Sequence, residues 1–270
     1  MDQVEGKDLW MSRESRLNNK VKLEVRTVMD IGPRGGQEDA VLVGTRVYQQ
    51  PNLDLQTEEE AAYVSLCVCD GMGGHAAGDI CSRFVLDEFN RAFSHDTSSP
   101  EGIDVLLNMI QTDAEGELPI NSGTTIAGVV LTEAQAVVFN AGDSRVYLMR
   151  AGELRRCSHD HSYVQSLVDK GAVSEAEAFT HPYRNVVSFG VGSAFSELWG
   201  HTKVHYKVLD VKPDDTYILC SDGVTDLIED PVMETVLGPS PITGVARLCV
   251  ELKRKTLKDN TTFIIARVVA

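Results

Sequence analysis

Five aspartates lie at the ends of short apolar segments, each beside a glycine or in a turn: Asp39, Asp70, Asp143, Asp222 and Asp259. A single Asp-Gly pair after a strand is usually only a turn. Five acidic strand ends in one domain would crowd negative charge if they met at one end of a sheet sandwich. Two carboxylates about 4 Å apart repel by about 4 kcal/mol at an effective dielectric constant of 20, a cost that protonation or multivalent cations relieve.

The residue types around these aspartates favour a hard cation. Carboxylate oxygens without a supporting histidine or cysteine cluster select Mg²⁺ or Mn²⁺ over zinc. His201 and His205 are four residues apart, but the residues around them alternate as in a strand. His159 and His161 share a loop, where a solvated or hydrogen-bonded role is expected. The sequence therefore predicts a magnesium or manganese site built from carboxylates.

Net charge and cysteine usage exclude several classes of protein. Lys and Arg number 25 and Asp and Glu number 40, which gives a net charge of −15. Such a surface repels phosphate backbones and anionic lipids, so neither nucleic-acid nor membrane binding is expected. The six cysteines show no paired CxxC spacing, and the chain begins without an apolar leader. Reduced, buried thiols and a cytoplasmic location are expected.

The first part of the chain predicts two strands, over 22–29 and 40–48, that pair with each other across a glycine-rich turn at 31–36. The acidic stretch 51–60 is expected to be an exposed loop. A nearly continuous apolar run at 61–69 is typical of a strand buried on both faces. The glycine-rich loop 71–78 leads into a helix, and a second helix is expected over about 102–112.

The remainder predicts short strands at 124–131, 136–140, 145–150 and 153–156, with turn signals at 141–143 and 151–152 that favour antiparallel pairing. Helices are expected over 161–171, 173–179, 230–237 and 242–252, and strands over 217–220 and 261–269. This order lacks the regular alternation of a doubly wound sheet, so antiparallel sheets with helices outside them fit better. No repeat or linker divides the chain, and one domain over 1–270 is expected.

Seven segments, in order, carry a family resemblance that covers about residues 25–269: PRGGQEDA, VCDGMGGHAAGD, SGTTIAGVVL, FNAGDSRVYLMRAGEL, DHSYVQSLVDKGAV, LCSDGVTDLI and KDNTTFIIARV. Together they resemble the successive motifs of the metal-dependent serine/threonine protein phosphatases of type 2C, the PPM family, in its bacterial form. The resemblance implies an α+β fold: a β-sandwich of two antiparallel sheets flanked by helices, in four αββα layers.

The resemblance also implies a metal site for Mn²⁺ or Mg²⁺ at one end of the sandwich. Asp70 would bridge two core ions, and Asp222 and Asp259 would hold the first of them. The Gly71 carbonyl would bind the second ion, which Glu38 would reach through water. A third, weaker ion would lie between Asp143 and Asp222.

The expected catalytic set consists of Arg34, Glu38 and Asp39, which lie just before the strand expected over 40–48. Arg34 matches the arginine that binds the substrate phosphate in this family, and Glu38 and Asp39 follow it. The planar fork of arginine suits two phosphate oxygens. Two divalent ions about 3.5–4 Å apart can lower the pKa of a shared water from about 15.7 toward neutrality. No protein nucleophile is then required, and no cysteine has the arginine six residues later that a cysteine-based phosphatase needs.

Two positions depart from the family pattern. At the position that follows Gly71, eukaryotic relatives have a histidine that is proposed to protonate the leaving group. Here the position is Met72, and bacterial relatives also have methionine. His75 is nearby, but a role at the helix start is equally consistent with it, so the general acid is either His75 or water. Gln37 stands where bacterial relatives often have asparagine. The stretch 161–184 corresponds to a mobile flap beside the site and is called the flap segment below.

Other functions remain open at this point. The spacing of Gly71, Gly73 and Ala76 after a strand mimics a dinucleotide fingerprint, although Asp70 would repel a pyrophosphate. A pseudophosphatase, an acidic interaction module and a phosphatase of small phosphorylated metabolites are the further alternatives. The favoured partners are phosphoserine and phosphothreonine proteins, the substrates of a serine/threonine kinase, and a monomer is expected.

Overall fold

Two β-sheets lie face to face in the computed structural model, which describes residues 20–72 and 77–269. The first sheet has six strands in the order β10-β9-β12-β13-β1-β4. Their bounds are β1 (Val21–Asp30), β4 (Asn52–Ala61), β9 (Arg145–Arg150), β10 (Glu153–Arg156), β12 (Thr216–Cys220) and β13 (Thr261–Val268).

The second sheet has seven strands, in the order β11-β8-β7-β5-β2-β3 with β6 paired to β5. They are β2 (Asp39–Val43), β3 (Arg46–Tyr48), β5 (Val64–Met72), β6 (Gly123–Thr124), β7 (Ile126–Leu131), β8 (Gln135–Ala141) and β11 (His205–Asp210). Neighbouring strands run antiparallel in both sheets.

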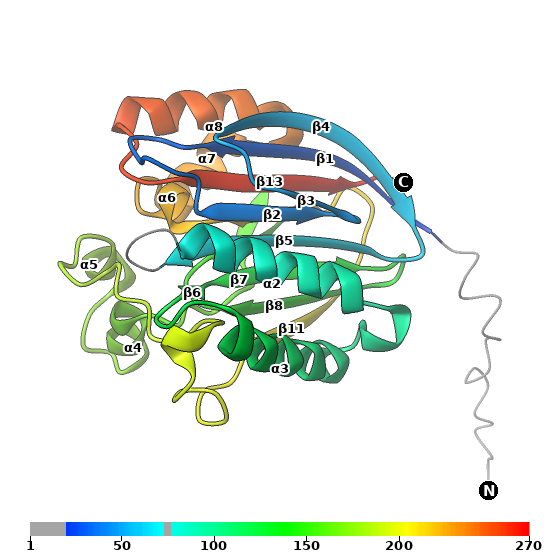
Figure 1. Ribbon diagram of the computed structural model, residues 1–270. Coiled ribbons are helices and arrows are strands. Elements are labelled where there is room, and N and C mark those ends of the chain that lie inside the picture. Colours follow the sequence, from blue (N-terminus) through cyan, green and yellow to red (C-terminus); the bar gives the residue numbers. More distant parts are fainter. Residues whose placement is uncertain (1–19, 73–76, 270) are drawn as a thin grey trace, which may run out of the picture.

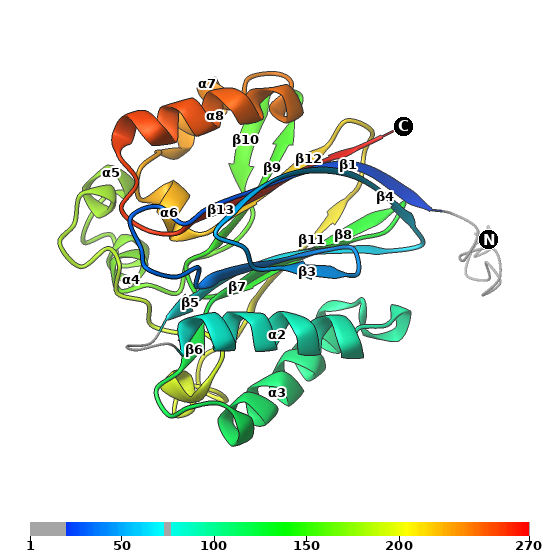
Figure 2. The same cartoon turned by 45° about the horizontal axis from the view of Figure 1, so that its top comes forward.

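Helices cover the outer face of each sheet (Figures 1 and 2). The second sheet is covered by α2 (Gly78–Ala92) and α3 (Pro100–Glu117), and the first by α7 (Asp230–Leu237) and α8 (Pro241–Lys255). The flap segment contains α4 (Tyr163–Asp169) and α5 (Glu175–Phe179); α6 (Asp222–Thr225), η1 (His95–Thr97) and η2 (Ser193–Phe195) are short. This arrangement confirms the expected α+β sandwich in four αββα layers.

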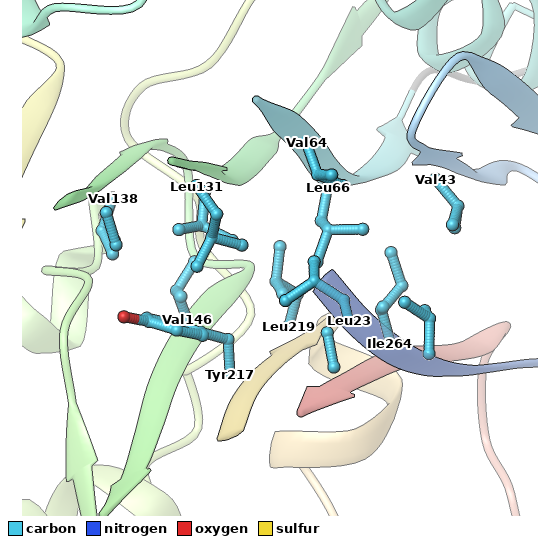
Figure 3. Packing of buried hydrophobic residues seen from close by; sticks show 14 of the residues in the cluster. Leu23, Val43, Val64, Leu66, Leu131, Val138, Val146, Tyr217, Leu219 and Ile264 are labelled. Carbon is cyan, nitrogen blue, oxygen red and sulfur yellow. The ribbon is translucent and has the colours of Figure 1, made fainter. Parts of the chain in front are cut away.

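The central core fills the space between the two sheets. Along β1 every second residue is buried, which places Leu23 and Val25 in this core while the intervening residues face outward. Leu66 of β5 and Ile264 of β13 meet them there from opposite sheets (Figure 3). Two outer cores pack α2 and α3 on the second sheet, and α7 and α8 on the first. The packed sandwich therefore holds the strand ends in fixed positions.

The pairing expected for the first strand is wrong. β1 pairs with β13 and β4 in the first sheet, whereas β2 pairs with β3 and β5 in the second. The turn at 31–36 therefore crosses from one sheet to the other. Local sequence marks this turn but carries no signal for a strand some 230 residues away, and the pairing of β1 with β13 depends on such a strand.

The stretch 51–60 is also not a loop, because β4 pairs with β1 along its whole length. Its burial alternates, with Leu53 and Leu55 half-buried between exposed polar residues. Charged side chains on a solvated edge strand protect it from pairing with other chains. In the sequence, the run of glutamates at 58–60 hides the alternation of apolar and polar residues that is typical of a strand.

A third expectation fails at the turn 141–143, which does not join paired strands. β8 belongs to the second sheet and β9 to the first. Gly142 adopts a φ of 114°, which glycine tolerates and other residues do not. The turn therefore carries the chain between the sheets, and Asp143 lies at their junction.

Two further observations concern the state of the cysteines and the character of the helices. All six cysteines are free thiols; Cys249 is partly exposed and the other five are buried. Within residues 20–72 and 77–269, none of the helices combines the length and the apolar character that crossing a bilayer requires.

Candidate metal centre

Asp39 and Asp70 are direct neighbours across the antiparallel pair of β2 and β5. Side chains alternate between the faces of a strand, and Val41 and Val68, two residues from each aspartate, lie in the core between the sheets. Asp39 and Asp70 therefore point into the same inter-sheet space, at its open end. Asp39 is fully buried, and Ser221 Oγ donates a hydrogen bond to its Oδ2 at 2.9 Å.

The first sheet supplies two more aspartates to this end. Asp222 follows β12 and begins α6, and Asp259 precedes β13 by two residues. The carboxyl groups of Asp70 and Asp222 lie within hydrogen-bonding reach of each other, and the charge of Asp259 acts on Asp222. Asp143, from the turn between the sheets, acts on Asp70. The five predicted aspartates thus converge on one end of the sandwich, and we call them the carboxylate cluster.

Burial and mutual repulsion perturb this cluster strongly. Burial raises the pKa of Asp70 and of Asp143 well above the usual range of a carboxyl group, and neighbouring aspartates add to both effects. Burial raises the pKa of Asp222 to about 6 and that of Asp39 to about 7. Each effect disfavours the charged form, so the cluster needs either protons or cations.

The residues present fit a hard divalent cation by the chemistry of their donors. The cluster offers carboxylate oxygens, which Mg²⁺ and Mn²⁺ prefer. Oδ1 of Asp39 is buried without a hydrogen-bond partner among the described residues. Within that same part of the chain, no three His, Cys, Asp or Glu side chains lie in an arrangement that could hold a metal ion without adjustment. The donors are suitable in kind and gathered at one end, where the carboxyl groups of Asp70 and Asp222 lie within hydrogen-bonding reach of each other.

Gly71 allows the backbone to approach this site closely. A Cβ atom at Gly71 would lie 2.1 Å from the carbonyl oxygen of Gly78 and 2.7 Å from that of Glu38. The Gly71 amide donates to the Glu38 carbonyl at 3.1 Å, and Ser82 Oγ donates to the same oxygen at 2.5 Å. Burial raises the pKa of Glu38. Only glycine fits where β5, α2 and the Glu38 backbone meet.

The guanidinium of Arg34 is hydrogen-bonded and ion-paired to Asp259. This bond is the main reason that the pKa of Arg34 is raised. Arg34 lies in the segment that crosses from the first sheet to the second, and Asp259 lies just before β13. The residue expected to bind phosphate and one expected to bind metal are thus in direct contact.

Asn260 is a structural residue that the sequence alone did not identify. Its Oδ1 accepts a hydrogen bond from the Glu38 amide at 2.8 Å, and its Nδ2 donates to the carbonyls of Ile31 (2.9 Å) and Gly36 (3.0 Å). It is 3% exposed. One buried amide therefore fixes both ends of the crossing segment that carries Arg34. The motif KDN contains this residue, but nothing local distinguishes such an amide from an ordinary turn residue.

Thr125 and Ser221 are two further residues without an earlier assignment. Thr125 Oγ1 accepts from the Asp70 amide at 3.0 Å and lies 2.7 Å from Ser144 Oγ, so it joins the end of β5 to the turn that carries Asp143. Ser221 joins Asp39 of the second sheet to the end of β12 in the first. Both hydroxyls therefore link the two sheets beside the cluster.

The residues that depart from the family pattern, and those of the dinucleotide-like segment, lie as follows. Met72 is the last residue of β5 and is partly exposed, and Gln37 is buried with its Oε1 accepting from the Asp39 amide at 3.1 Å. His75 lies outside the described residues, as do Gly73 and Ala76 of the dinucleotide-like segment.

Comparison with known proteins gives matches to protein phosphatases. Residues 35–166 match the family described as protein phosphatase 2C. The serine/threonine phosphatase stp of Listeria welshimeri is 34% identical over 181 residues, which span 63% of this chain and 70% of that relative. The serine/threonine protein phosphatase PstP of Mycobacterium tuberculosis is 30% identical over 253 residues, 87% of this chain and 43% of PstP.

Solved structures show the same similarity in three dimensions. The serine/threonine phosphatase Stp1 from Staphylococcus aureus superposes with a TM-score of 0.75 at 26% identity, covering 99% of this chain and 100% of the other. The catalytic domain of PstP, solved in complex with two manganese ions, gives a TM-score of 0.70 at 27% identity and covers 93% and 100% of the two chains.

Proposed function

Because this chain belongs to the protein phosphatase 2C family, we infer that it hydrolyses phosphoserine and phosphothreonine in proteins, as a bacterial-type, metal-dependent serine/threonine phosphatase. The observation that carries this function is the convergence of acidic strand ends from both sheets, with an arginine beside them. A divalent cation needs the acids, and a phosphate dianion needs the arginine.

Mn²⁺ or Mg²⁺ is the cofactor, and the two manganese ions in the PstP structure support this. We assign the two core ions to Asp70, Asp222, Asp259 and the Gly71 carbonyl, with Glu38 acting through water, and a third, weaker ion to Asp143 and Asp222. When bound, such ions supply Lewis-acid chemistry: they acidify water for attack on phosphorus and offset charge on the phosphoryl oxygens.

The chain's own residues have separate tasks in this proposal. Arg34 binds the substrate phosphate through its planar fork, for which it must leave Asp259. Asp39 holds the end of β12 through Ser221 and so positions the neighbouring Asp222. Asn260 holds the backbone of Glu38 and of the segment that carries Arg34 in place through its hydrogen bonds to the Glu38 amide and the Gly36 carbonyl. Met72 brings no proton donor, so we leave the general acid to His75 or to water.

We further propose that residues 1–270 form one phosphatase domain, with 161–184 as its mobile flap. The substrates are then phosphoproteins made by a serine/threonine kinase, and the enzyme is a cytoplasmic monomer. The free thiols support a reducing compartment. The net charge of −15 speaks against nucleic-acid and membrane partners.

The test compares two substrates and one matched pair of variants. Protein loaded with Mn²⁺ should hydrolyse both p-nitrophenyl phosphate and a phosphothreonine peptide, and chelator should stop both reactions. Asp222→Asn, which keeps the volume and removes the charge, should leave less than about 10% of the peptide turnover, a loss of more than about 1.4 kcal/mol of transition-state stabilisation. Asp87→Asn, on the exposed face of α2, is the control.

Two outcomes contradict the proposal. Full peptide turnover by the chelator-treated protein would exclude the metal-dependent reaction. Hydrolysis of p-nitrophenyl phosphate without hydrolysis of any phosphopeptide would favour a phosphatase of small metabolites.

A further inference from the structure

A cavity of about 350 Å³ lies between the flap segment and the helices α6 and α7. These elements gather at the end of the sandwich that carries the carboxylate cluster (Figure 1). Asp143 belongs to both, because it lines the cavity and its charge acts on Asp70. Asp226 also lines the cavity and its charge acts on Asp222, and its amide donates to the Asp222 carbonyl at 2.7 Å. A substrate group in this cavity would therefore lie next to the reacting phosphate.

The charge of the cavity wall favours a cation. Six acidic side chains line it, against three arginines. Each arginine is already bonded to a carboxylate: Arg145 to Asp160 at 2.6 Å, Arg156 to Glu175 at 2.7 Å and Arg184 to Asp226 at 3.2 Å. None of the three is left free to bind an anion. A second phosphate group is therefore a poor occupant.

Two acidic side chains of the wall have no such partner. Asp143 is only 7% exposed; its own backbone amide donates to its carboxylate and the charge of Arg145 attracts it, but it forms no ion pair with a described cation. Glu229 is exposed at the start of α7, where its side chain neither caps the helix nor pairs with a described cation. Because the proposed third ion engages Asp143, Glu229 at the rim is the acid of this wall that is left for a cationic group of the substrate, among the described residues.

Part of the rest of the wall is apolar and suits a long aliphatic chain, beside the polar Ser162, Gln165 and Thr225. Val164 and Phe179 come from the flap segment, and Pro231 comes from α7. Lysine and arginine bury their methylene stems along apolar surface while the charged head stays with water or an anion. An aromatic ring such as that of Phe179 also attracts a cation. The combination matches a basic side chain better than a purely apolar one.

We propose that this cavity binds the basic side chain of an arginine or lysine that flanks the phosphorylated residue of the substrate, with Glu229 as the residue that determines this preference. The inference rests on the proposed phosphatase function, since the phosphate anchors the substrate beside the cavity. It narrows the substrate class to phosphoproteins with a basic residue near the phosphoserine or phosphothreonine.

The test uses phosphothreonine peptides that carry no other charged side chain. One arginine is moved along the peptide, and each peptide is paired with a partner in which neutral citrulline replaces that arginine. At one or more positions kcat/KM for arginine should exceed that for citrulline about fivefold, the upper range for a solvent-accessible ion pair. This preference should weaken as salt is raised.

Variants of Glu229 identify the residue responsible. Glu229→Gln should bring the arginine-to-citrulline ratio close to one, and Glu229→Lys should take it below one. Glu133→Gln, an exposed acid in the turn between β7 and β8, serves as the matched control and should keep the ratio of the unmodified protein. A shared loss of turnover on both peptides of a pair leaves the ratio unaffected, so a folding defect cannot imitate the expected result.

The contrary outcomes are distinct from one another. Equal rates for arginine and citrulline at every position, or a preference that survives Glu229→Lys, overturn this inference while leaving the phosphatase function intact. Absence of turnover on every peptide and on p-nitrophenyl phosphate overturns the phosphatase function, and this inference with it.

Discussion

Arg34 and Asp259 bond to each other across 225 residues of sequence, at the end of the sandwich where the aspartates converge. Arg34 comes from the segment between β1 and β2, and Asp259 from the segment before β13. A cation on Asp259 would compete with Arg34, and a phosphate would compete with Asp259. Ligands at this site therefore exchange partners with an existing ion pair instead of entering an unpaired set of charges.

Replacing Arg34 by alanine should have opposite effects on the two ligands. Loss of charge-assisted hydrogen bonds worth about 1.5–3 kcal/mol should weaken the apparent affinity for a phosphopeptide about 10- to 150-fold. Mn²⁺ should bind at least as tightly as before, because Asp259 loses a competing cation. Steady-state kinetics and calorimetry measure the two effects. Unchanged KM and kcat would show that Arg34 is only an exposed turn residue.

Removing metal should lower both activity and stability. Cations bind only the folded cluster, so they stabilise the protein by about 2.7 kcal/mol at a concentration one hundred times Kd. Chelator should abolish phosphopeptide turnover and lower the melting temperature, and added Mn²⁺ should restore both. A melting temperature that ignores Mn²⁺ would be evidence against a cation among these aspartates.

The metal-free protein should lose stability as the pH rises from about 4 to about 7. Burial raises the folded-state pKa of Asp39 to about 7 and that of Asp222 to about 6, above the value near 4 of an unfolded aspartate. The folded state therefore binds these protons more tightly than the unfolded state does. The resulting gain in the free energy of unfolding is complete below the unfolded pKa and is lost as the pH rises through the folded-state pKa values. Denaturant titrations of chelator-treated protein should show this fall in the free energy of unfolding.

Two variants separate this effect from general titration of the surface. Asp39→Asn should flatten the pH dependence, whereas Glu133→Gln in an exposed turn should not. With Mn²⁺ present the trend should reverse, because only deprotonated carboxylates bind the metal. A stability of the metal-free protein that rises between pH 4 and pH 7 would contradict the assignment.

Asn260→Ala should destabilise the protein by about 2–4 kcal/mol, because three hydrogen bonds of a buried amide are lost together. Denaturant unfolding measures the loss. Asn108→Ala provides the control, since Asn108 bonds only within its own helix on the surface of α3. Equal effects of the two substitutions would mean that Asn260 does not anchor the crossing segment.

Asp143→Ala should separate metal binding by the core residues from turnover. Asp70, Asp222 and Asp259 remain, so calorimetry should still report tight binding of the core ions. A third ion with one protein carboxylate fewer should be lost selectively, because few charged ligands make a weak site. Turnover of phosphopeptide should then fall strongly. Turnover like that of the unmodified protein at every metal concentration would remove the third ion from the scheme.

The positions of the acids could be predicted from sequence because each marks the end of an apolar strand. In an antiparallel sandwich the start of one strand lies beside the end of its neighbour, so Asp39 at the start of β2 meets Asp70 near the end of β5, and register decides which acids face each other. The facing of Asp39 and Asp70 follows from the pairing of β2 with β5, which the sequence did not indicate. The expected pairing of β1 with β2 would have placed Asp39 in the other sheet.

The supporting residues could not be predicted for a different reason. Asn260, Ser221 and Thr125 are small polar residues in turns and strand ends, where such residues are ordinary. Their roles depend on hydrogen bonds to partners up to 229 residues away. The local sequence around each residue does not identify such distant partners, whereas an acid beside a glycine at a strand end can be recognised from local sequence alone.

The carboxylate cluster is divided between the two sheets, with Asp39 and Asp70 on the second and Asp222 and Asp259 on the first. A cation shared between the two groups would act as a reversible cross-link across the seam of the sandwich. Amide hydrogens near this end of β2, β5 and β12 should then gain protection from exchange together when Mn²⁺ is added, while those at the opposite end change little. The same ion would thus govern how readily the two halves of the fold separate.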